Sequence, residues 1–159
     1  MLTPAPVLFT KSAGLLTETA ENVTGTEVDM TRIDDTQLVG MAPAVVMQIA
    51  LALRPRLDIT HEELDQLFLK VAHGFGWKAA HFRPAKTAKG WRTPVTGDGK
   101  GFLDWLLVKD RVLVIELKTR DDQLRPEQKE WIATWEGARV EVHVFWPKDW
   151  DEMVQALAS

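Results

Sequence analysis

The fold follows from one apolar stretch, Gly101-Phe-Leu-Asp-Trp-Leu-Leu-Val-Lys-Asp-Arg-Val-Leu-Val-Ile-Glu-Leu-Lys118. Two runs of strand-forming residues, 102–108 and 112–118, flank a short polar connection, and this pattern is typical of a β-hairpin. Each run contains a carboxylate that packing alone does not explain, Asp104 in the first and Glu116 in the second. If the two runs pair across the turn, we expect Asp104 to approach Glu116 across the ladder.

The sequence on either side of this hairpin predicts helices and another strand. Residues 61–75 place apolar side chains at helical spacing behind a capping residue, Thr60. Residues 126–136 begin with Pro and end before Gly137, which predicts a second helix. Together with the hairpin, these segments predict an α/β fold in which helices flank a mixed central sheet. Further expectations are a short strand at 78–82, a long loop at 83–101, inward packing of Trp131, Ile132 and Trp135, a strand at 140–146 and a last helix through Leu157.

The distribution of residue types suggests two regions, an N-terminal extension over 1–58 and a main domain over 59–159. All seven Trp lie between Trp77 and Trp150, in the main domain. The Ala- and Leu-rich run 42–53 predicts a helix within the extension. We expect this helix either to be buried in the core or to pack against a second subunit.

Composition narrows the protein class. A chain of 159 residues that is 45% hydrophobic suits one globular domain. Because the chain has no Cys, disulfides, thiolate nucleophiles and cysteine-bound metals are excluded. No apolar run approaches the roughly 20 residues of a membrane span, and the start lacks the pattern of a secretory signal. We therefore expect an intracellular protein with no membrane partner.

The net charge of −4 conceals a basic middle region. Residues 70–125 carry twelve Lys and Arg against six Asp and Glu, and the rest carries seven against seventeen. This polarity favours a localised anionic ligand. The long loop is the natural place to bind phosphates, because loops of this length in compact domains are usually functional or disordered. The candidate nucleic-acid contacts are Arg83, Lys86, Lys89, Arg92 and Lys100, with His81 from the preceding strand.

The hairpin residues also suggest a metal site. Asp104, Glu116 and the carbonyl of Leu117 form an oxygen donor set that suits a hard divalent ion such as Mg²⁺. Side chains alternate along a strand, so Lys118 shares the face of Glu116 and could orient an attacking water or stabilise negative charge. Such an ion lowers the pKa of its bound water, which phosphodiester hydrolysis requires. The alternative is an ordinary edge-strand ion pair with a polar residue near the turn.

From about residue 59 to residue 157, the sequence resembles the VRR-NUC (virus-type replication–repair nuclease) branch of the PD-(D/E)XK nuclease superfamily. In two places the chain departs from the usual family pattern: Leu103 replaces Pro before the Asp, and Arg125 replaces a helix-capping Ser. The resemblance rests on the order and spacing of His61-Glu-Glu-Leu-Asp65, Gly76-Trp77, His81, Gly101-Phe-Leu-Asp104, Val114-Ile-Glu-Leu-Lys118, Leu124-Arg-Pro-Glu-Gln-Lys-Glu-Trp131 and Val142-His-Val-Phe-Trp-Pro-Lys-Asp-Trp150.

The resemblance implies a restriction-endonuclease-like core in which the two hairpin carboxylates bind metal. It further implies that Lys118 is the catalytic lysine and that Gln128, on the following helix, faces the active site. Glu63 best matches the acid of the family's N-terminal helix, with Glu62 as the alternative.

The implied activity is that of a Mg²⁺-dependent endodeoxyribonuclease, with Mn²⁺ able to replace Mg²⁺. Single-domain relatives act as homodimers on branched DNA such as Holliday junctions, in DNA repair, and the family suggests a phage or prophage source. Two alternatives remain open. One is an endonuclease that reads a specific duplex sequence, although the basic loop is the only evident recognition element. The other is a non-catalytic DNA-binding module on the same fold.

Overall fold

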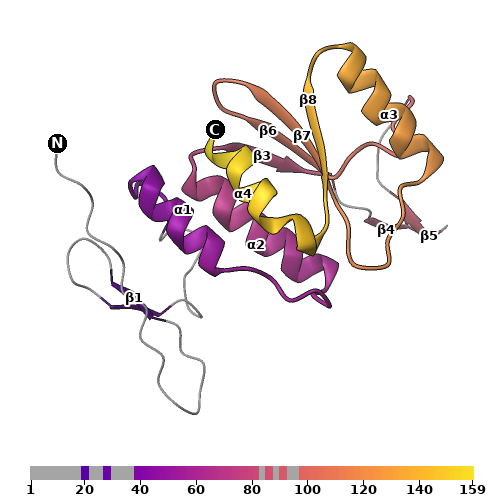
Figure 1. Cartoon of the computed structure of the whole chain (residues 1–159). Helices are drawn as coiled ribbons and strands as arrows, with labels where there is room; N and C mark the ends of the chain where they lie inside the picture. Colours follow the sequence, from indigo (N-terminus) through magenta and orange to yellow (C-terminus); the bar gives the residue numbers. More distant parts are fainter. Residues whose placement is uncertain (1–18, 22–26, 30–37, 83–84, 88–89, 93–96) are drawn as a thin grey trace.

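The computed structural model gives the chain a mixed α/β fold built on a four-stranded sheet (Figure 1). Two small antiparallel hairpins accompany it, β1 (Thr19–Glu21) with β2 (Glu27–Asp29) and β4 (Ala85–Thr87) with β5 (Gly90–Arg92). The structure describes residues 19–21, 27–29, 38–82, 85–87, 90–92 and 97–159, and describes side chains within 38–82 and 97–159.

The central sheet has the strand order β3-β6-β7-β8. Its first three strands are antiparallel neighbours, whereas β7 and β8 run parallel, so the sheet is mixed as predicted. In the predicted hairpin, Trp105 lies opposite Ile115. Residues 113–117 are all buried, because β7 is an inner strand covered on both faces. The strands are β3 (Lys78–His81), β6 (Trp105–Val108), β7 (Val112–Leu117) and β8 (Glu141–Phe145).

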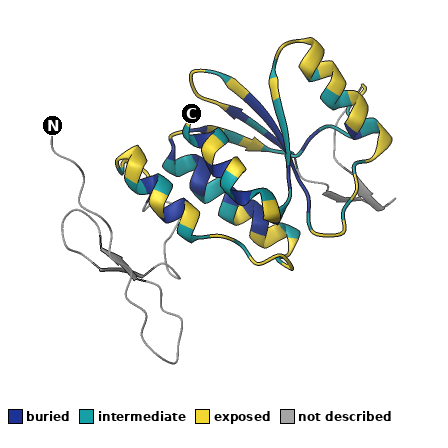
Figure 2. Cartoon of the chain, in the orientation of Figure 1, coloured by how far each residue is buried: buried dark blue, intermediate teal, exposed yellow. Residues whose placement is uncertain are grey.

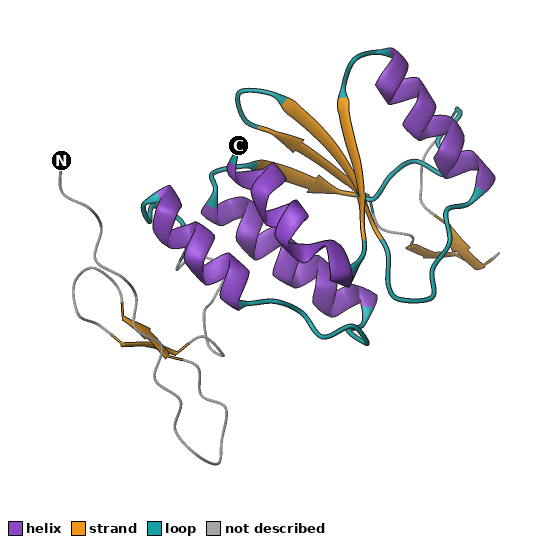
Figure 3. Cartoon of the chain, in the orientation of Figure 1, coloured by secondary structure: helices purple, strands orange, loops and turns teal. Residues whose placement is uncertain are grey.

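Helices lie on both sides of this sheet (Figures 1 and 3). Three of them, α1 (Pro43–Ala52), α2 (His61–Gly74) and α4 (Trp150–Ala158), pack together on one side, with α4 following the short 3-10 helix η2 (Pro147–Asp149). The fourth, α3 (Pro126–Gly137), lies on the other side of β8. No helix within the described part of the chain is long and apolar enough to cross a membrane.

Helix α1 belongs to the core of the domain. Its Val46 and Ala50 are fully buried in the same apolar cluster as α2, α4 and the sheet. The indole Nε1 of Trp150 also donates a hydrogen bond of 2.7 Å to the backbone oxygen of Ala50. The expected boundary at residue 58 therefore falls inside one packed unit. The core interpretation of this helix is confirmed, and its contact with a second subunit remains a prediction.

The α3 prediction needs a correction. Its buried residue is Gln128, whereas the three apolar side chains expected to point inward are only partly buried (Figure 2). The Trp131 indole Nε1 donates hydrogen bonds to the backbone oxygens of Asp98 and Lys100, and its ring meets Phe102 edge-on at 4.9 Å. These aromatic residues thus pack α3 against the loop before β6, and the helix turns its polar Gln128 toward the sheet.

The segment expected to be one long loop, 83–101, contains the β4–β5 hairpin. The many Gly and Pro residues in this stretch are compatible with short strands joined by tight turns as well as with a loop. Its alternation is too brief to have indicated strands in advance.

Candidate active site

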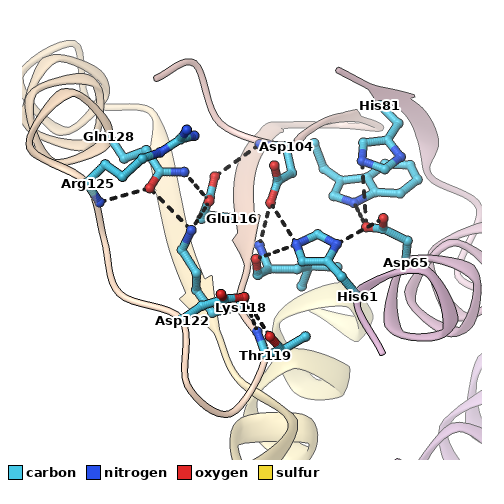
Figure 4. A network of polar contacts seen from close by, with 12 residues as sticks. His61, Asp65, His81, Asp104, Glu116, Lys118, Thr119, Asp122, Arg125 and Gln128 are labelled. Atoms are coloured by element: carbon cyan, nitrogen blue, oxygen red, sulfur yellow. Dashed lines mark hydrogen bonds and ion pairs between the residues drawn. The ribbon is translucent and has the colours of Figure 1, made fainter. Parts of the chain in front are cut away.

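The two hairpin carboxylates meet at the end of the sheet where β6 begins and β7 ends (Figure 4). The backbone N–H of Asp104 donates to Oε2 of Glu116 at 3.3 Å. In return, Oδ2 of Asp104 accepts a hydrogen bond of 3.1 Å from the backbone N–H of Leu117. The register of the hairpin therefore produces the predicted approach of Asp104 to Glu116.

Burial makes it unfavourable for Asp104 and Glu116 to carry negative charge at the same time. Glu116 is 1% exposed, and the Asp104 side chain is 19% exposed. Desolvation by burial, followed by repulsion from Glu116, raises the pKa of Asp104 to about 7. Two carboxylates held this close in a poorly solvated place favour a neighbouring positive charge.

Lys118 supplies a positive charge directly after β7. Its Nζ lies 2.6 Å from Oε1 of Glu116 and donates a hydrogen bond of 3.2 Å to Oε1 of Gln128. The Nε2 of Gln128 donates to the same Oε1 of Glu116, so the three side chains contact one another. All three are buried. The structure thus brings together the residues that the sequence assigned to the strand end and to the following helix.

Gln128 is held in place by its position in the first turn of α3, where its side chain also caps the helix. It is the third residue of α3, and its Oε1 accepts a hydrogen bond of 3.0 Å from the backbone N–H of Arg125. Gly101 has a φ of +76°, and a Cβ added there would lie 2.5 Å from Cβ of Glu127. The loop before β6 therefore approaches the first turn of α3 at a distance that only glycine allows, and it holds Gln128 beside the carboxylates.

On the opposite side of the site, α2 contributes His61. The Nε2 of His61 lies 3.2 Å from the backbone oxygen of Leu117 and 3.9 Å from Oδ2 of Asp104. Its Nδ1 lies 3.3 Å from Oδ2 of Asp65, one helical turn further along α2. The hydrogen bond with Asp65 is the main reason that the pKa of His61 rises to about 9. His61 thus connects the carboxylate pair to α2.

Asp65 is the buried acid of α2, at 4% exposure. Its Oδ1 accepts a hydrogen bond of 3.0 Å from the indole Nε1 of Trp105. Burial alone would raise the pKa of Asp65, but hydrogen bonds from His61 and Trp105 outweigh burial, and the pKa lies below its ordinary value. Sequence reasoning did not select His61 or Asp65. The sequence did contain a pattern that could have indicated their contact. His61 and Asp65 are four residues apart, so they lie on the same face of the helix, and Asp65 directly follows Leu64 of the apolar stripe.

The structure places Glu63 in contact with Thr60 at the start of α2. Its Oε2 accepts hydrogen bonds from the backbone N–H and the hydroxyl of Thr60, at 2.9 and 2.7 Å, which completes a capping box at the start of α2. Both Glu63 and Glu62 are exposed. Glu63, expected to be the helix acid of the site with Glu62 as the alternative, is thus engaged at the helix cap, and the acid of α2 that contacts His61 is Asp65.

His81 and Lys100, both expected to contact nucleic acid, have partners within the protein. The His81 ring stacks on Trp105 with centroids 4.0 Å apart, and its Nε2 lies 3.6 Å from Asp65. The His81 side chain is 15% exposed and joins the network of Asp65 and Trp105, and its contact with nucleic acid remains a prediction. Lys100 is exposed but forms an ion pair with Glu127. The side chains of Arg83, Lys86, Lys89 and Arg92 lie outside the described residues.

The donor set has the chemistry of a site for a hard divalent cation. Asp104 and Glu116 offer carboxylate oxygens, and Leu117, whose backbone N–H donates to Asp104, offers a carbonyl oxygen. Within the described ranges, no three His, Asp or Glu side chains already stand in an arrangement that would hold a metal ion. In this structure Oε1 of Glu116 is bound by Lys118 and Gln128.

The chain was compared with known protein families, curated proteins and solved structures, and no match was found in any of the three comparisons.

Proposed function

We propose that this protein is a metal-dependent endodeoxyribonuclease of the VRR-NUC type, built on a PD-(D/E)XK core, that hydrolyses phosphodiester bonds in branched DNA as a homodimer. The observation that carries the proposal is the buried convergence of two carboxylates, a lysine and a glutamine at the end of one hairpin. These residues are Asp104, Glu116, Lys118 and Gln128.

The cost of burying these groups supports a catalytic role over a structural one. Lys118 is 7% exposed and Glu116 is 1% exposed. Removing two charges from water costs several kcal/mol per ion, and their attraction often only offsets that cost. A well-packed apolar pair would stabilise the fold at least as well. The buried charges are therefore better explained by chemistry at this point of the sheet.

Asp104, Glu116 and the Leu117 carbonyl would hold Mg²⁺ or Mn²⁺ here. When bound, such an ion polarises the phosphoryl oxygen and provides a water of lowered pKa. The contribution of Lys118 is a positive charge beside the reacting phosphate, where it stabilises the negative charge that develops in the transition state. Gln128 accepts a hydrogen bond from Lys118 and so fixes the direction of its ammonium group.

The experiment is a cleavage assay with labelled four-way junction, splayed-arm and linear duplex DNA, each with Mg²⁺, Mn²⁺ or EDTA. We expect paired, metal-dependent nicks in the junction, because a symmetric dimer places two sites on opposed strands. Cutting of linear duplex at one sequence would instead indicate a sequence-specific endonuclease. Binding of DNA without cutting under either metal would contradict the proposal and favour a non-catalytic module.

A further inference from the structure

We infer that His61 is a nitrogen ligand of the metal ion, bound through Nε2 after the ion displaces the proton of that nitrogen into solvent, and that the site therefore takes Mn²⁺ in preference to Mg²⁺. This inference rests on the proposed function, because it concerns the same cation. It adds a residue from α2 to a donor set that otherwise consists of oxygen atoms from the β6–β7 hairpin.

The spacing of the donor atoms supports this assignment. In an octahedral site with bonds of about 2.1 Å, neighbouring ligand atoms lie about 3.0 Å apart and opposite ones about 4.2 Å apart. The Nε2 of His61 lies 3.2 Å from the oxygen of Leu117 and 3.9 Å from Oδ2 of Asp104. Both separations fall in the range that one shared ion requires. The three donors come from different segments, so one helical turn does not explain their convergence.

The environment of Nδ1, the other ring nitrogen of His61, independently supports the assignment of His61 as a metal ligand. A metal-binding histidine usually donates a hydrogen bond from its second ring nitrogen to a carboxylate, a backbone carbonyl or a water, and this bond fixes the orientation of the ring. The Nδ1 of His61 lies 3.3 Å from Oδ2 of Asp65, and Asp65 is fixed in turn by the Trp105 indole at 3.0 Å. A buried carboxylate thus orients the ring so that Nε2 faces Leu117 and Asp104 (Figure 4).

The His61 ring is also accessible from solvent. Its side chain is 42% exposed, whereas Asp65 behind it is almost fully buried. Because the ring is exposed, solvent reaches one side of it. A catalytic metal site keeps a position open to water or substrate, and an exposed ligand held by a buried carboxylate is compatible with that requirement.

The choice of metal follows from the ligand. Mg²⁺ is bound almost entirely by oxygen and gives up its water reluctantly, whereas imidazole suits first-row transition ions. Mn²⁺ accepts carboxylate ligands as Mg²⁺ does and, as a first-row transition ion, also accepts imidazole. A His on α2 therefore shifts the preference of this site from Mg²⁺ toward Mn²⁺.

The test is pulsed electron paramagnetic resonance of the full chain with one equivalent of Mn²⁺ and no DNA. We expect a ¹⁴N modulation of the size given by directly bound imidazole, and we expect ¹⁵N-labelled histidine to replace it with a ¹⁵N signal. His61→Gln should lose the signal, and the matched control His143→Gln should keep it, because His143 binds Glu141 on β8. Asp65→Asn should weaken Mn²⁺ binding about 10- to 100-fold.

The outcomes are distinct. Bound Mn²⁺ without an imidazole signal in the wild-type protein would overturn the inference while leaving the proposed metal-dependent nuclease intact. A signal that persists in folded His61→Gln would overturn it as well. If Mn²⁺ does not bind the wild-type protein at all, the inference fails together with the metal site of the proposed function. The wild-type spectrum decides the question even if His61→Gln does not fold.

Discussion

Gln128 donates a hydrogen bond from Nε2 to Oε1 of Glu116, and this bond joins the first turn of α3 to the inner strand of the sheet. The same amide accepts hydrogen bonds from Lys118 and from the backbone of Arg125 through its oxygen. One side chain therefore belongs both to the cap of α3 and to the candidate catalytic site. A substitution of this residue should change both the stability of the helix and the activity of the site.

Gln128→Ala should lower both stability and cleavage. The substitution removes a capping interaction worth about 1 kcal/mol, and it takes one hydrogen-bond partner from each of the buried groups Lys118 and Glu116, which costs about 1–3 kcal/mol. We expect the free energy of unfolding in urea to fall by about 2 kcal/mol or more. The control is Lys129→Ala, one residue further along α3 and exposed. Equal stability of the two variants would show that the amide bridge contributes nothing.

Gly101→Ala should disturb the site through the backbone. A Cβ at Gly101 meets the first turn of α3 at 2.5 Å, and the residue has a φ of +76°. Gly97, with a φ of +70° and nothing within 4 Å, is the matched control because it shares the backbone strain without the contact. Gly97→Ala should cost about 1 kcal/mol, and Gly101→Ala should cost clearly more and reduce cleavage. Similar thermal stability and activity of both variants would contradict the close approach.

Glu63→Gln should change the pH dependence of stability and leave cleavage unchanged. Hydrogen bonds from the side chain and backbone of Thr60 lower the pKa of Glu63 below 4.5. A lowered folded-state pKa means that Glu63 stabilises the protein above pH 4.5 and loses this contribution as the pH falls through the folded-state pKa. Glutamine keeps the capping box without the charge.

The wild-type advantage over Glu63→Gln in thermal unfolding should therefore shrink as the pH is lowered from 6 toward about 3. A loss of cleavage in Glu63→Gln at neutral pH, with the fold retained, would instead return Glu63 to the active site.

Val46→Ala should destabilise the whole domain. Val46 is fully buried between α1 and the core, so the substitution leaves a cavity that costs about 1–3 kcal/mol. Gln48→Ala on the exposed face of the same helix serves as the control. A single cooperative transition with a lower midpoint for Val46→Ala is expected in chemical unfolding. An unchanged midpoint would indicate that α1 is a separate appendage, as the boundary at residue 58 supposed.

Local sequence patterns predicted the elements that depend on local chemistry. The Thr60 cap, the helical spacing of residues 61–75 and the hairpin around 109–111 are all found in the structure. Asp104 and Glu116 stood out because a carboxylate in an apolar strand has no packing reason to be there. The pairing register then determined their approach, and a tight turn makes that register predictable.

The rest depended on contacts between distant segments. Glu63 and Asp65 lie on the same helix, and only tertiary packing shows that Asp65 meets Trp105 while Glu63 remains at the cap. Trp131 looked like a core residue, but its partners are in the loop before β6. The role of His61 depends on the position of the Leu117 carbonyl, 56 residues away, which no local pattern specifies.

The central claim is that Lys118 takes part in phosphodiester hydrolysis, and the most direct measurement is the single-turnover cleavage rate of a four-way junction by Lys118→Ala and by Lys129→Ala, with saturating Mn²⁺. We predict that Lys118→Ala binds the junction as the wild-type protein does but cuts it about 10²- to 10³-fold more slowly, whereas Lys129→Ala cuts at the wild-type rate. Cleavage by folded Lys118→Ala at the wild-type rate would contradict the account.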